Sequence, residues 1–129
     1  MANLVKGIGI SSLRLDFRRP GMVDSSTQDC LMGIEFLRKK EISNVVVVGH
    51  SFGGAVAVQT GIASDLVSGV ITLASQTEGA EDAGLLSPTP ILVVHGDSDT
   101  HLPLPLAFRL YGWAEHPKDL VILAGAGHG

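Results

Sequence analysis

The sequence alternates short apolar runs with longer segments of helical period, and this alternation restricts the fold more than any other feature. Apolar runs bounded by turn residues are typical of buried strands, and a helical segment between successive runs is typical of βαβ units. We therefore expect an α/β fold with a mostly parallel sheet. The predicted strands are residues 12–17, 44–49, 69–73, 90–95 and 119–123.

Three segments between these strands have the pattern of helices, at residues 27–40, 52–63 and 104–113. In the first, apolar side chains recur at steps of three and four residues, which makes one stripe along a helix. Cys30 belongs to that stripe, so we interpret it as a core residue rather than a reactive thiol. The second segment is rich in glycine and alanine, which allows a helix to approach a sheet closely.

Composition excludes several classes of function. The net charge is −4, and the few basic residues include the adjacent Lys39 and Lys40 but form no long basic run, so no basic patch for nucleic acid is expected. No apolar run reaches the roughly 18 residues of a membrane span, so we expect no membrane partner. One cysteine excludes an internal disulfide and favours a reducing compartment, which predicts a cytoplasmic location.

The run Gly49-His50-Ser51-Phe52-Gly53 lies between a predicted strand and a predicted helix, which is the context that a Gly-x-Ser-x-Gly nucleophile turn requires. Such a turn strains the serine backbone, so the positions two residues away must lack bulk, and both are glycine. We expect Ser51 to be a nucleophile. The backbone N–H of Phe52 would then be one donor to an oxyanion, at the positive end of a helix.

A serine hydroxyl needs a base to remove its proton, so a histidine must approach it in space. His128 follows the last predicted strand in a glycine-rich loop that can carry an imidazole over the sheet edge. We therefore predict His128 as the base. The other histidines are assigned elsewhere: two to structural positions beside strand ends, and two to a solvent-facing helix region; they are His50, His95, His101 and His116.

The imidazole in turn needs a carboxylate, which should follow another strand. Asp97 and Asp99 both qualify, because both follow the strand at residues 90–95. A turn residue that accepts bonds from loop amides is the plainer interpretation of either one. Spacing favours Asp99 only slightly and leaves Asp97 open.

Three runs together resemble the α/β-hydrolase family: Gly-His-Ser-Phe-Gly-Gly after a strand, then His-Gly-Asp-Ser-Asp-Thr, then Gly-Ala-Gly-His-Gly. The resemblance covers most of the chain and implies a three-layer α/β/α sandwich. In that family the order along the chain is serine, acid, histidine, which maps onto Ser51, Asp99 and His128. The family's acid stands three residues after a glycine, so Gly96 selects Asp99, and Asp97 falls on a variable position.

Within the family, the dienelactone-hydrolase-like branch is the most similar, although dienelactone hydrolases themselves carry cysteine where this chain has Ser51. The resemblance implies a carboxylesterase-type serine hydrolase that acts on a small-molecule ester through an acyl-enzyme. It implies no metal and no organic cofactor. It leaves the substrate and the oligomeric state unspecified.

The chain departs from the family at both ends. Family members begin with strands and a loop that supplies a second oxyanion donor, and they continue past the histidine into a closing helix. Residues 4–10 resemble the end of a helix. We therefore expect residues 1–129 to be one incomplete domain, a partial α/β-hydrolase fold. Loss of one oxyanion donor lowers turnover on the order of a hundred- to a thousandfold, which predicts a weak catalyst.

Two other functions remain compatible with the sequence. A peptidase or a thioesterase would use the same three residues, and the sequence does not distinguish their substrates from esters. A binding protein without catalysis can also have this fold, because fold does not determine function. The presence of both Ser51 and His128 favours an enzyme over that alternative.

Overall fold

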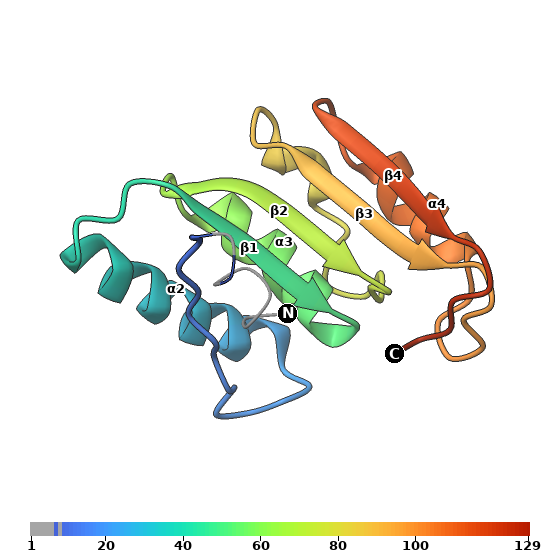
Figure 1. Ribbon diagram of the computed structural model, residues 1–129, viewed down its shortest axis with the longest axis horizontal. Helices are drawn as coiled ribbons and strands as arrows, with labels where there is room; N and C mark the ends of the chain where they lie inside the picture. Colours follow the sequence, from blue (N-terminus) through green and yellow to red (C-terminus); the bar gives the residue numbers. More distant parts are fainter. Residues whose placement is uncertain (1–6, 8) are drawn as a thin grey trace.

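The computed structural model describes residue 7 and residues 9–129. Along the chain the elements are α2 (Val23–Lys39), β1 (Val45–His50), α3 (Phe52–Ala63), β2 (Val67–Leu73), the 3-10 helix η1 (Ala83–Leu86), β3 (Ile91–Gly96), α4 (Pro105–Trp113) and β4 (Lys118–Leu123). The strands form one sheet in the order β1-β2-β3-β4, and each neighbouring pair is parallel (Figure 1). The α/β fold class expected from the sequence is confirmed.

Most of the predicted elements are present. The four strands differ from the predicted bounds by one or two residues at most, and α3 has the predicted bounds. Helix α2 begins at Val23, four residues before the predicted start. Its first turn is polar, and Asp24 there is favoured by the positive end of the helix dipole, which supports the earlier start. Cys30 is buried, and burial raises the pKa of its thiol.

The hydrophobic core lies between the sheet and α3. Side chains from β1, β2 and β3 point at this helix, and alanine and valine on α3 meet them. The buried members on α3, β2 and β3 include Ala55, Ala57, Val58, Val70, Ile91 and Val93. Gly61 shows how close the contact is, because a Cβ there would be 2.6 Å from a methyl group of Val70. Small residues on α3 therefore set the spacing between helix and sheet.

Among the described residues, the opposite face of the sheet is apolar and partly exposed. Val46 and Val48 on β1 are 53% and 41% exposed, and Val121 and Leu123 on β4 are 42% and 47% exposed. The strand register places all four on the same face. In Figure 1, α3 and α4 lie behind the sheet, on the other face. The described residues thus form the sheet and one helical layer of the sandwich.

Residues 12–17 do not form the predicted strand, and they pair with no strand among the described residues. The segment lies against α2 instead. A Cβ at Gly33 would be 3.0 Å from a methyl group of Leu15, and the Asp29 carboxylate accepts bonds from the Arg18 backbone N–H at 2.9 Å and from Arg18 Nε at 2.5 Å. The alternation of Leu13, Leu15 and Phe17 reflects contact with helices and not with a sheet. Leu13 and Leu15 lie beside Gly33 of α2, and the Phe17 ring lies edge-on to Phe52 at the start of α3. The helix end predicted over residues 4–10 lies largely outside the described residues.

Candidate active site

The predicted nucleophile lies in a strained turn between β1 and α3. Ser51 has φ 55° and ψ −120°, a backbone conformation that residues other than glycine rarely adopt. Its N–H donates to Leu73 O at 2.9 Å, and its carbonyl accepts from the N–H groups of Gly54 and Gln76 at 3.0 and 3.3 Å. Bonds to β2 and to the loop after β2 therefore hold the turn. Because Phe52 is the first residue of α3, its N–H has no acceptor within the helix and can serve an anion.

The glycines around Ser51 have different steric roles. A Cβ at Gly49 would be 1.9 Å from the carbonyl oxygen of Gly53, which no side chain tolerates. A Cβ at Gly54 would be 2.2 Å from Ser75 Oγ. A Cβ at Gly53 would meet nothing within 4 Å, so the expectation that Gly53 must lack bulk is wrong. The close contacts that require glycine are at Gly49 and Gly54.

Asp99 lies in the loop that follows β3, and its side chain is fully buried. Oδ1 accepts the backbone N–H groups of His101 and Leu102 at 2.9 and 2.8 Å. Burial alone would raise the pKa of this carboxyl, but the bonds from His128, Leu102 and His101 outweigh it and lower the pKa to about 2. Asp99 is therefore a carboxylate at neutral pH, and one of its oxygens remains directed at His128.

Asp97 has a different role from Asp99. Its Oδ1 accepts the backbone N–H of Gly125 at 2.7 Å, and the N–H of Ser98 donates to Ala126 O at 3.0 Å. These bonds join the loop after β3 to the loop after β4. Gly96 allows the two loops to meet, because a Cβ there would be 2.1 Å from Ala126 O. Asp97 thus accepts a loop amide, which is the plainer of its two interpretations from the sequence.

His128 connects the other two predicted residues. Its Nδ1 is 2.8 Å from Asp99 Oδ2, and its Nε2 is 3.0 Å from Ser51 Oγ. A carboxylate only accepts hydrogen bonds, so Nδ1 carries the proton and Nε2 is free to accept one from the serine hydroxyl. The three side chains come from the carboxyl ends of β1, β3 and β4, where parallel α/β sheets place their sites. This arrangement can move a proton from Ser51 to His128 while Asp99 stabilises the imidazolium.

Sequence reasoning missed contacts that two other histidines make. The rings of His50 and His101 have centroids 4.9 and 4.7 Å from that of His128, so they flank the predicted base. The signal was their position, since each lies within two residues of a predicted site residue. His95 is buried as expected, with its Nε2 2.8 Å from Leu102 O, and His116 is exposed as expected.

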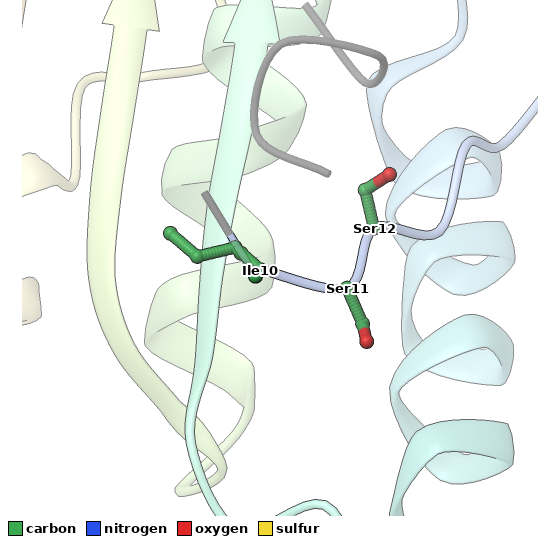
Figure 2. Close-up of a pocket in the computed structure, with 4 residues that line it drawn as sticks. Ile10, Ser11 and Ser12 are labelled. Carbon is green, nitrogen blue, oxygen red and sulfur yellow. The ribbon is translucent and has the colours of Figure 1, made fainter. Parts of the chain in front are cut away.

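Two hollows of the surface lie away from the predicted site residues. One of about 430 Å³ is lined by residues 9–12, where the chain passes from Ile10 to Ser12 (Figure 2). A second of about 410 Å³ lies between residues 13–18 and α2. None of the three predicted site residues lines either one.

Over residues 7 and 9–129, no group of three or more histidine, cysteine or acidic side chains is arranged to bind a metal ion. No helix in the described part of the chain could cross a bilayer.

Several solved structures that resemble this chain are named as hydrolases or esterases. An esterase domain from Rhodothermus marinus superimposes with a TM-score of 0.71 at 19% identity, over 79% of this chain and 60% of that one. An alpha-beta serine hydrolase homologue from Coxiella burnetii gives 0.73 at 21%, over 95% and 57%. A predicted CIB-like hydrolase from Thermoplasma acidophilum gives 0.68 at 24%, over 92% and 56%.

The chain spans less than two thirds of the length of each of these three structures. No family model matches its sequence, and no curated protein is significantly similar to it. At these identities the likeness establishes the arrangement of the backbone. The chain therefore has the fold of the α/β hydrolases.

Proposed function

We propose that this chain is a serine hydrolase that cleaves carboxylic esters, with Ser51 as nucleophile, His128 as base and Asp99 as acid. One observation carries the proposal. His128 contacts Ser51 through one ring nitrogen and the buried Asp99 carboxylate through the other, at 3.0 and 2.8 Å. A chain of hydrogen bonds in this order activates a serine hydroxyl, and chance seldom produces it at a strained strand-to-helix turn.

The proposed reaction uses this geometry as follows. His128 Nε2 takes the proton of Ser51 Oγ as the oxygen attacks the ester carbonyl carbon. The oxyanion that forms accepts the N–H of Phe52 at the start of α3. The intermediate collapses, the alcohol leaves with the proton held by His128, and an acyl-enzyme remains. Water then loses a proton to His128 and attacks the acyl carbon. Collapse of this second intermediate breaks the bond to Ser51 Oγ and releases the acid, and His128 returns the proton to Ser51 Oγ.

The solved hydrolases with this fold include an esterase domain and a serine hydrolase homologue, which supports hydrolysis as the reaction class. The resemblance of the three sequence runs together to the α/β-hydrolase family, with the dienelactone-hydrolase-like branch the most similar, supports a small ester as substrate. Peptidase and thioesterase activities use the same three residues, so a comparison of substrates must separate them.

The test is a comparison of three acyl substrates with a common acyl group: a short-chain p-nitrophenyl ester, a thioester and a p-nitroanilide. We expect turnover of the ester above that of the other two, and loss of that turnover in Ser51→Ala. Faster turnover of the thioester or the anilide would contradict the ester assignment. Equal ester turnover by Ser51→Ala would contradict the assignment of the nucleophile.

A further inference from the structure

The last residue of β1 contacts the backbone of the proposed base. His50 Nε2 is 2.6 Å from the carbonyl oxygen of His128. A carbonyl oxygen only accepts, so His50 carries a proton on Nε2 and donates it. The bond joins residues 78 positions apart in the sequence. It therefore connects the loop after β4 to the end of β1, the strand that leads into the nucleophile turn.

We propose that His50 is a positioning residue, which holds the backbone of His128 so that its imidazole stays within reach of Ser51. This rests on the proposed function. The loop after β4 is fixed at two earlier points, through Gly125 and Ala126. Gly127 then separates those points from His128, and glycine leaves the backbone free to rotate.

In the described part of the chain, the bond from His50 is the one hydrogen bond to the backbone of His128. The ring of His128 is held by Asp99 at Nδ1, but one such bond leaves the ring free to pivot about it. A second fixed point on the backbone removes that freedom. Because His50 directly precedes Ser51, one strand end holds both the nucleophile and the anchor of its base.

Two substitutions separate the hydrogen bond from the ring contact. His50→Phe keeps an aromatic ring beside His128 and removes the donor, whereas His50→Gln keeps an N–H donor and removes the ring. His116→Phe is the matched control, because His116 is also an exposed histidine and makes no side-chain contact with the proposed site. For each variant, kcat and KM on a p-nitrophenyl ester and the melting temperature are measured.

We expect His50→Phe to lower kcat by about ten- to a hundredfold, because misplacement of about 1 Å costs up to that much. KM and the melting temperature should stay near those of the unmodified chain. His50→Gln should recover most of the lost kcat, and His116→Phe should behave as the unmodified chain. An unchanged kcat in His50→Phe would overturn the proposal, and so would equal losses in the Phe and Gln variants.

A nuclear magnetic resonance measurement keeps this test independent of activity. In the ¹⁵N-labelled chain, we expect a proton on His50 Nε2 that exchanges slowly with water, and broadened ring signals of His128 in His50→Phe. Sharp and unshifted His128 signals in that variant would overturn the proposal that His50 holds the backbone of His128. If the unmodified chain hydrolyses no acyl substrate, the proposed function fails, while these signals still decide whether His50 fixes His128.

Discussion

At the scale of single residues, Asp97 and Asp99 differ in the hydrogen-bond donors that their carboxylates accept from. Asp99 is buried and accepts from the ring of His128 as well as from two backbone N–H groups, whereas Asp97 is exposed and accepts from the backbone of Gly125. The two residues stand two positions apart in one loop, so spacing alone could not separate them. The family's Gly-x-x-Asp pattern selects Asp99, and Asp99 is the carboxylate that contacts the His128 ring.

Exchanging each carboxylate for an amide should separate the two roles. Asp99→Asn removes the charge that stabilises the imidazolium and permits the wrong tautomer of His128, so kcat should fall on the order of 10³- to 10⁴-fold. Asp97→Asn keeps an oxygen that can accept the Gly125 N–H, so kcat should change by about threefold or less. Ester turnover by the two variants decides. The assignment is wrong if Asp97→Asn is the variant that loses turnover.

At the scale of elements, four of the five predicted strands are present, including the two edge strands β1 and β4. The runs at residues 44–49 and 90–95 were found because apolar side chains and turn residues bound them clearly. Residues 12–17 have the same local pattern but pack on α2, where Arg18 binds Asp29. Strand propensity is decided by tertiary partners, and a local pattern does not reveal them.

The turn between β1 and α3 supplies a second test. Gly49→Ala forces a methyl group into the carbonyl of Gly53, so the free energy of unfolding should fall by about 1 to 3 kcal/mol or more. Gly53→Ala places its methyl group in open space at the start of a helix, and its stability should equal or exceed that of the unmodified chain by up to about 1 kcal/mol. Urea unfolding of both variants measures the difference. Equal destabilisation by the two would contradict the steric account of the turn.

At the scale of the whole molecule, the two faces of the sheet differ in what covers them. The face toward α3 holds the core, and the opposite face exposes valine and leucine from β1 and β4. The sequence predicted the parallel sheet and the helix beside it. It could not predict which apolar strand residues a helix covers. A strand buried on both faces and a strand buried on one face have similar compositions when their side chains are all valine, isoleucine and leucine.

A pair of matched substitutions tests this difference between faces. Val70 is 1% exposed and faces α3, so the hydroxyl in Val70→Thr would be buried and should cost about 1 to 3 kcal/mol of unfolding free energy. Val48 is 41% exposed on the open face, so Val48→Thr should cost about 0.5 kcal/mol or less. Thermal unfolding of both variants provides the comparison. A larger loss in Val48→Thr would mean that the open face is covered in solution.

The measurement that tests the central claim most directly is the mass of the chain after reaction with a fluorophosphonate, with the adduct located by fragmentation. A fluorophosphonate reacts with a serine only when a base activates it. We predict one adduct, on Ser51, that is absent in Ser51→Ala and strongly reduced in His128→Ala. A chain that unfolds cooperatively but acquires no adduct, or one that acquires it at another residue, would contradict the proposal that Ser51, His128 and Asp99 form a catalytic site.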